Sequence, residues 1–156
     1  MEWLAPLAET PLARALIVSP TLYLLVNAAH IMAIATLFGS ILALDLRLLG
    51  LGPAVPLPPV AAYLSRIAGI GLLLAILTGF CLFSVRPLEY ARNTAFLAKL
   101  ALVALGLLNV AVAHFAPGWR RVLAGEAPAM SVRLGAAISI LIWIGAVVAG
   151  RWIGFL

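Results

Sequence analysis

Four long apolar runs, separated by short breaks rich in polar residues, proline and glycine, make up most of this 156-residue chain. The runs cover residues 21–49, 60–85, 94–116 and 132–155. A hydrocarbon core of about 30 Å takes about 20 apolar residues in an α-helix, and each run is long enough. We therefore predict an all-α integral membrane protein, a four-helix bundle that forms a single transmembrane domain over residues 1–156.

The breaks between the runs contain residues that end helices. They lie at 50–60 (GLGPAVPLPPV), 84–93 and 116–131. An even number of spans puts both chain termini on one side of the membrane, here called side A, together with the break at 84–93. The other two breaks lie on side B. Lysine and arginine are equally numerous on the two sides, and the location of Lys99 inside a span rather than in a loop favours side B as the cytoplasmic side.

A short helix is predicted before the first span, within TPLARALIVSP at residues 10–20. Thr10 is a residue type that caps helix N-termini, Pro11 suits the first helical position, and Pro20 would end the helix. We expect this segment to form a short interfacial helix.

Composition agrees with a membrane location. Hydrophobic residues make up 65% of the chain and charged residues 10%, with a mean hydropathy of +1.20, whereas soluble domains are about 25% charged. The net charge of +5 comes from basic residues that form no patch or stripe, so contact with lipid headgroups is favoured and a nucleic-acid partner is not expected. Cys81 is the single cysteine of the sequence, which excludes an intrachain disulfide.

Depth along the spans indicates which polar residues can meet. At 1.5 Å per residue, His30 lies about 13 Å from the side-A start of its span and Lys99 about 9 Å from the side-A start of the third span. His114 lies about 30 Å along that third span, near side B and at the level of Asp45. The two histidines are therefore not expected to bind the same metal or haem.

The residues expected near His30 suggest a cofactor. Asn27 precedes His30 by three positions and shares its helix face, while Lys99, Arg86 and Arg92 supply positive charge at the same end of the bundle. A basic, apolar site with one histidine suits a large hydrophobic anion such as haem b, with imidazole on the iron and cations on the propionates. We therefore predict a cofactor site formed by His30, Lys99, Asn27, Arg86 and Arg92, with His30 as the metal ligand. Equally, His30 can be a structural hydrogen-bonding residue and Lys99 an anchor that extends to the interface.

Other polar and small residues have plain structural interpretations. Asp45 is expected to form an interfacial ion pair with Arg66 or Arg133, and His114 to lie at the interface. Glycines within the spans are expected to allow close helix packing, as is common in membrane bundles. These glycines are Gly69, Gly71, Gly79, Gly135, Gly145 and Gly150. Trp143 lies deep enough in its span to line a pocket.

Several segments together support a resemblance. SPTLYLLVNAAHIM, SILALDLRLLGLG, LTGFCLF and NTAFLAKLALVALGLLNVAVAH resemble an uncharacterised family of small four-helix bacterial membrane proteins, over nearly the whole chain. The chain is more distantly similar to the haem-containing bacterial protoporphyrinogen oxidase and to copper-resistance D-type membrane proteins. That similarity implies a location in the bacterial inner membrane. It matches His30 to the first-span histidine of the oxidase, and the AKLALV segment containing Lys99 to a segment whose lysine the oxidase requires.

The sequence also departs from that oxidase. Leu97 stands where the oxidase has a second histidine, and the fourth span reads SVRLGAAISILIW where the oxidase has an Asn-Glu-x-Pro motif. The resemblance therefore implies a haem or porphyrin site and not the oxidase reaction.

Three functions follow as hypotheses. The first is a haem- or porphyrin-binding protein that transfers electrons to or from a quinone or a redox partner, as a component of a membrane oxidoreductase. The second is a small oligomeric transporter or channel for protons, metal or a small anion. The third is a non-catalytic membrane anchor or accessory subunit. Motifs of soluble hydrolases and nucleotide-binding enzymes are absent from the sequence.

Overall fold

The computed structural model describes residues 2–52 and 55–155. The described residues fold entirely into helices, turns and short connections, without strands. In chain order the elements are η1 (Glu2–Glu9), α1 (Pro11–Val18), α2 (Pro20–Leu48), α3 (Leu57–Val85), α4 (Pro87–Arg92), α5 (Thr94–Phe115), α6 (Pro117–Leu123), α7 (Met130–Trp152) and η2 (Ile153–Phe155).

The predicted spans are confirmed as helices. α2, α3, α5 and the continuous segment from α7 through η2 are each long and apolar enough to cross a membrane. Their boundaries differ from the sequence-based ranges by at most three residues, as is usual where helix ends fray. The all-α fold and the multi-pass character of the protein both follow from these four helices.

The short helix predicted before the first span is also present. The side-chain oxygen of Thr10 accepts a hydrogen bond from the backbone N–H of Ala13 at 3.3 Å, as a helix cap does. Ser19 then ends α1 and caps α2, whose first residue is Pro20. Pro20 therefore ends one helix and begins the next.

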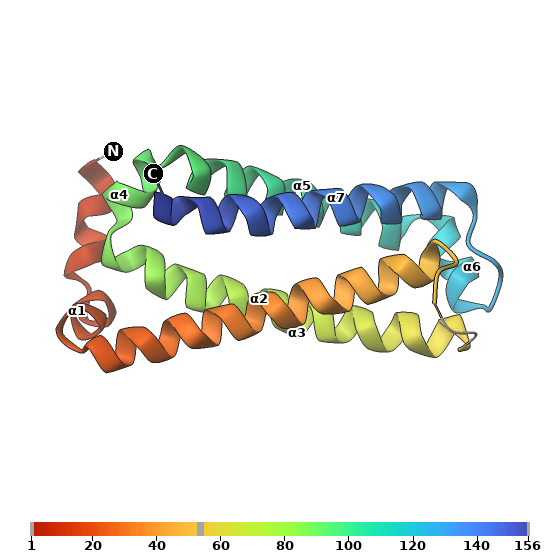
Figure 1. The fold of residues 1–156 in the computed structure, drawn as a ribbon, viewed down its shortest axis with the longest axis horizontal. Helices are drawn as coiled ribbons and strands as arrows, with labels where there is room; N and C mark the ends of the chain where they lie inside the picture. The colour runs from red at the N-terminus through yellow and green to blue at the C-terminus, as the bar shows by residue number, and fades with distance from the viewer. Residues whose placement is uncertain (1, 53–54, 156) are drawn as a thin grey trace.

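The four long helices form two layers (Figure 1). α2 packs along α3 in one layer, and α5 packs along α7 in the other. Across the layers α2 contacts α7, whereas the backbones of α3 and α5 do not come close to each other anywhere in residues 2–52 and 55–155. Both chain termini lie with α4 at one end of the bundle, side A, and α6 lies at the other end, side B.

The α2–α3 contact is close enough for backbone to meet backbone. A methyl group added at Gly71 of α3 would lie 2.7 Å from the backbone nitrogen of Leu37 and 3.1 Å from the carbonyl oxygen of Ala33, both on α2. Such distances are shorter than van der Waals contact, so only glycine fits here. Gly71 therefore has the packing role that the sequence suggested.

A buried cluster at side B joins both layers. Trp119 and Val122 of α6 pack against Leu44 and Leu48 of α2, and Ala61 and Ala136 complete the cluster from α3 and α7. α6 thereby covers this end of the bundle. Large apolar side chains are exposed along all four long helices, which is the surface expected to face lipid.

Candidate functional site

His30 lies between α2 and α3, where a threonine holds its ring. The Nδ1 atom of His30 lies 2.8 Å from the hydroxyl oxygen of Thr78. That hydroxyl donates its single hydrogen to the carbonyl oxygen of Leu74 at 2.6 Å, so it can only accept from the imidazole. Nδ1 therefore carries the proton, and Nε2 keeps a free lone pair. A histidine that ligates a metal is commonly oriented by such a bond from its other ring nitrogen.

Gly79 makes room for the His30 ring on α3. A methyl group added at Gly79 would lie 3.0 Å from Cε1 of His30 and 3.6 Å from Nδ1. The imidazole thus packs closely against the α3 backbone at Gly79, next to its hydrogen bond with Thr78. The position of the ring is therefore set by two consecutive residues of α3.

Lys99 approaches the same region from the other layer. Its side chain extends along Gly150 of α7, where an added methyl would lie 3.4 Å from Cδ and 3.7 Å from Nζ. Among the described residues no carboxylate forms an ion pair with it. His30 and Lys99 both lie in the side-A half of their helices, one in each layer. Their participation in one site stays a prediction.

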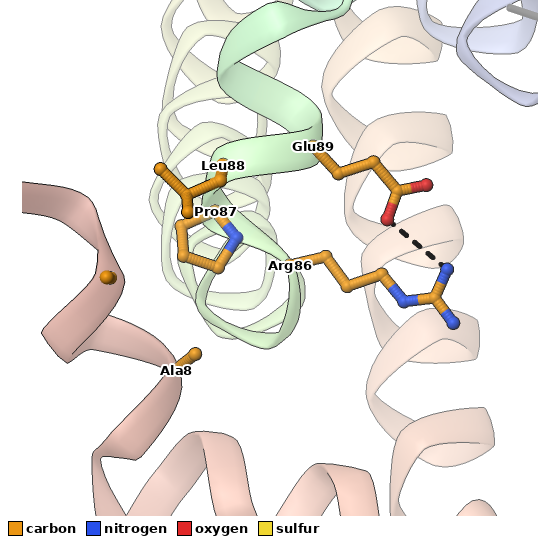
Figure 2. Close-up of a pocket in the computed structure, with 6 residues that line it drawn as sticks. Ala8, Arg86, Pro87, Leu88 and Glu89 are labelled. Atoms are coloured by element: carbon orange, nitrogen blue, oxygen red, sulfur yellow. Dashed lines mark hydrogen bonds and ion pairs between the residues drawn. The ribbon is translucent and has the colours of Figure 1, made fainter. Parts of the chain in front are cut away.

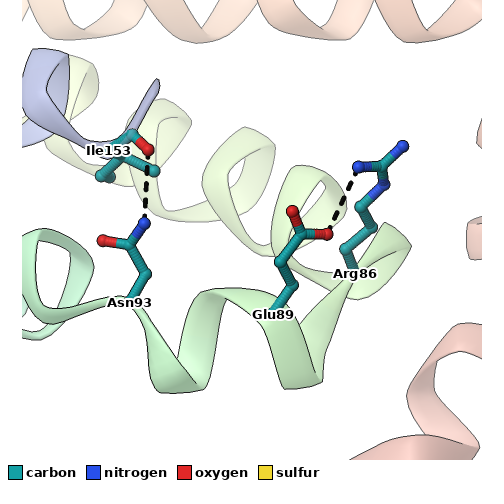
Figure 3. A network of polar contacts seen from close by, with 4 residues as sticks. All are labelled: Arg86, Glu89, Asn93 and Ile153. Carbon is teal, nitrogen blue, oxygen red and sulfur yellow. Dashed lines mark hydrogen bonds and ion pairs between the residues drawn. The ribbon is translucent and has the colours of Figure 1, made fainter. Parts of the chain in front are cut away.

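The other three predicted site residues are exposed. Asn27 is exposed on α2. Arg86, at the start of α4, forms an ion pair with Glu89 at 3.3 Å, and both side chains are about two-thirds exposed, at 68% and 67% (Figure 3). Arg92 is exposed at the end of α4. Within the described part of the chain, none of the three forms a hydrogen bond with His30 or Lys99.

Arg86 and Glu89 also border a surface hollow between η1 and α4 (Figure 2). Its volume is about 310 Å³, and Ala5, Ala8, Pro87 and Leu88 complete its lining. His30 and Lys99 are not part of it. The hollow thus offers one exposed ion pair and apolar walls, and it does not extend the His30 region.

α4 is fixed in place by contacts with the ends of three helices. Phe83 stacks on Phe96 with ring centroids 5.5 Å apart, and Tyr90 packs against both rings. The Asn93 amide donates to the carbonyl oxygen of Ile153 at 3.3 Å, which ties the α4–α5 junction to the C-terminal end (Figure 3). Burial raises the pKa of the Tyr90 phenol, and Tyr23 adds to the shift. The phenol therefore stays neutral beside the Arg86–Glu89 pair.

A second polar region lies at side B, in a cavity of about 260 Å³ between α2, α3, α5, α6 and α7. Most of its wall is aliphatic. Its polar lining residues are Asp45, Ser65, Asn109, His114, Ser131 and Ser139, with the indole of Trp143. Trp143 therefore lines a pocket, as its depth in the sequence suggested. Its indole lies across Gly106 of α5, where an added methyl would be 2.9 Å from the ring.

The prediction that Asp45 forms an ion pair with Arg66 or Arg133 is wrong. Asp45 is only 6% exposed, and no ion pair joins it to Arg66 or Arg133 in residues 2–52 and 55–155. Its carboxyl group faces the bundle interior, where the hydroxyl of Ser139 interacts with it. Both arginines are exposed on the outer faces of their helices. Helix rotation, which the sequence positions did not reveal, separates the carboxylate from the two guanidinium groups.

His114 lies at the cavity and not near His30. Its Nδ1 donates to the carbonyl oxygen of Val110 at 2.9 Å, and its ring packs on Trp119 with centroids 4.4 Å apart. The separation of the two histidines predicted from depth is confirmed. No group of three or more histidine, cysteine, aspartate or glutamate side chains forms a metal cage in the described ranges.

Two contacts of these regions were not predicted from the sequence: the pairing of Thr78 with His30 and that of Ser139 with Asp45. Ser139 precedes Trp143 by one helical turn, so the two residues share a helix face. That spacing is the signal that would have placed Ser139 on the inward-facing surface of α7. For Thr78 the sequence contains no comparable signal.

The fold and these polar groups define a small multi-pass all-α membrane protein with ionisable residues inside its bundle. The chain belongs to a family of unknown function, DUF6644, whose model matches residues 20–156. No curated protein and no solved structure matches it. The predicted membership of an uncharacterised family is thereby confirmed, while the distant similarity to the haem-containing oxidase stays a prediction.

Proposed function

We propose that this protein binds b-type haem, or a related porphyrin, with Nε2 of His30 as an axial ligand, and that it transfers electrons within the bacterial inner membrane. The observation that supports this most is the hydrogen bond from His30 Nδ1 to Thr78. It leaves Nε2 unprotonated, which is the form of imidazole that binds iron.

The neighbouring residues suit the same ligand. Lys99 has no carboxylate partner among the described residues, so its ammonium is available to a propionate. In residues 2–52 and 55–155 no group of three or more histidine, cysteine, aspartate or glutamate side chains surrounds His30, which suits an iron whose other ligands come from a macrocycle, and not a bare ion. Asn27 and Arg92 are exposed and would pair with haem only from the outer edge of the site.

When bound, haem supplies one-electron redox chemistry, and the chain's own residues position and enclose it. Thr78 orients the imidazole, Gly79 admits the ring against α3, and Lys99 places a positive charge in an apolar surrounding. A cation there favours a bound anion and the reduced state of a nearby iron.

The test is the visible spectrum of the purified protein, titrated with haemin in detergent. We expect a Soret band that saturates at one haem per chain, and reduction by dithionite should sharpen it into a b-type spectrum. A protein that stays colourless with excess haemin would overturn the proposal. If such a colourless protein instead copurifies with one stoichiometric partner, the anchor function is favoured.

Replacing Thr78 with valine should weaken haem binding without abolishing it. Valine has the same shape but no hydroxyl, so Nδ1 loses its acceptor and the ring loses its fixed orientation. Removal of such an orienting bond typically costs about 10- to 100-fold in metal affinity. The measurement is the haemin dissociation constant from Soret titration.

Thr36→Val is the matched control for this change. The Thr36 hydroxyl also donates to a carbonyl of its own helix, that of Met32 at 2.9 Å, but on an exposed face. Equal haem affinities in Thr78→Val and Thr36→Val would contradict the role given to Thr78.

A further inference from the structure

The cavity at side B contains buried polar atoms without partners. Oδ2 of Asp45, Oγ of Ser65 and Nε1 of Trp143 are all buried, and none has a hydrogen-bond partner within residues 2–52 and 55–155. All three residues line the same cavity. Asp45 is 6% exposed and Trp143 is 4% exposed. A buried polar group without a partner is destabilising, so three around one cavity point to a ligand that pairs with them.

The cavity opens between the two layers of the bundle. Its wall includes Gly69 of α3 together with Leu107 and Val112 of α5, and all three are exposed. α3 and α5 belong to different layers, and their backbones do not come close to each other in the described part of the chain. The opening therefore lies on the lateral, lipid-facing side of the bundle, and a molecule dissolved in the bilayer can enter there.

The polar groups of the cavity determine which ligand chemistry fits it. The Asp45 carboxylate accepts a hydrogen bond, and the Trp143 indole donates one. Ser139, the neighbour of Asp45, lies one turn of α7 before Trp143, a rise of about 6 Å. A ring with a hydrogen-bond donor at one end and an acceptor at the other can pair with both groups. The remaining wall is mainly aliphatic, which suits the ring itself and an attached tail.

We propose that this cavity binds the head group of a membrane quinol. One quinol hydroxyl donates to Asp45, and the oxygen at the opposite end of the ring accepts from Nε1 of Trp143. A phospholipid phosphate is disfavoured because the carboxylate repels it. The site is separate from His30 and Lys99, and it exists whether or not the protein binds haem.

The chemistry also predicts a preference between redox forms. A quinone has only acceptor oxygens, so it cannot donate to the Asp45 carboxylate. We therefore expect decylubiquinol to bind at least about tenfold more tightly than decylubiquinone at an alkaline pH that keeps Asp45 ionised, the effect of one hydrogen bond to a charged group. The measurement is calorimetric titration of the pigment-free protein in lipid nanodiscs under argon, with empty nanodiscs as the blank.

Two substitutions test the proposal. Asp45→Asn should weaken quinol binding by about tenfold or more and remove the preference for quinol, because the amide can donate to quinone. Trp143→Phe keeps an aromatic ring and removes only the N–H group. It should therefore weaken the binding of quinol and of quinone by about the same factor. It keeps the proposal testable if Asp45→Asn does not fold.

The matched controls are Glu89→Gln, an exposed acid at side A, and Trp152→Phe, a tryptophan that is 55% exposed. Both should bind quinol like the unmodified protein. Quinol uptake no greater than in empty nanodiscs, or equal affinities in Asp45→Asn and the unmodified protein, would overturn the proposal. Saturable binding of a lipophilic amine, together with no binding of quinol, would also overturn the proposal. Because the titration uses pigment-free protein, its result is independent of the haem test.

Discussion

Replacing Gly71 with alanine is expected to cause the largest loss of stability of any single methyl addition in the α2–α3 layer. The added carbon would lie 2.7 Å from the Leu37 backbone nitrogen and 3.0 Å from its Cα. A flexible side chain can move away from such a contact, but a helix backbone cannot, so the two helices must separate. Overpacking of a core typically costs about 1–3 kcal/mol, and separation of the helices loses further contacts.

Gly69→Ala is the control for this substitution. Gly69 lies two residues earlier in the same helix, and an added methyl there meets nothing within 4 Å. Both variants gain the helix propensity of alanine. We expect thermal unfolding in detergent to show a lower midpoint for Gly71→Ala and an unchanged or slightly higher one for Gly69→Ala. Equal midpoints would mean that the backbone approach of α2 and α3 is not required.

Replacing His30 with alanine is expected to abolish the Soret band of the haem-loaded protein. Alanine removes the nitrogen proposed as iron ligand and leaves Thr78 without its partner. Residual haem would be held only by apolar contact and by Lys99. The measurement is the Soret absorbance per chain after haemin titration and removal of free haemin.

His114→Ala separates ligation from general effects of losing a histidine. His114 also has Nδ1 bound to a carbonyl, that of Val110, but it lies at side B beside Trp119. The His114→Ala protein should keep the full Soret band. A band of unchanged height and position in His30→Ala would show that another residue ligates the iron.

The fold was largely predictable because it follows from length and hydropathy. Runs of apolar residues must be helical in lipid, where every backbone group needs an internal partner. Proline and glycine mark their ends, which is why α2 begins at Pro20 and α4 at Pro87. The capping role of Thr10 was readable for the same reason, since caps depend on local sequence alone.

The rotation of each helix about its axis was not predictable in the same way. In a membrane the lipid-facing and buried surfaces are both apolar, so hydrophobic periodicity carries little information. Gly69 and Gly71 were therefore given the same packing role, although only Gly71 meets a neighbouring backbone. The mistaken prediction of an ion pair for Asp45 has the same origin. Depth placed Asp45 at the correct level of the bundle, but the direction in which its side chain points from α2 remained unknown.

The candidate site was predictable only as far as the depth of each residue along its span determines which residues can meet. Depth alone brought His30 and Lys99 to one region and separated His114 from them. Depth does not specify lateral neighbours, so Thr78 was not assigned to His30. Arg86 was assigned from its place near side A, whereas the structure pairs it with Glu89 at 3.3 Å.

The two-layer arrangement has a consequence for how the protein is made. Each layer consists of transmembrane helices that follow one another in the chain, α2 with α3 and then α5 with α7. During synthesis the first hairpin can therefore complete its contacts, including the one at Gly71, before the second hairpin leaves the ribosome. The contacts that α7 makes with α5 and with α2 must wait for the end of the chain. The order of synthesis thus matches the order in which local contacts can form, which favours rapid assembly.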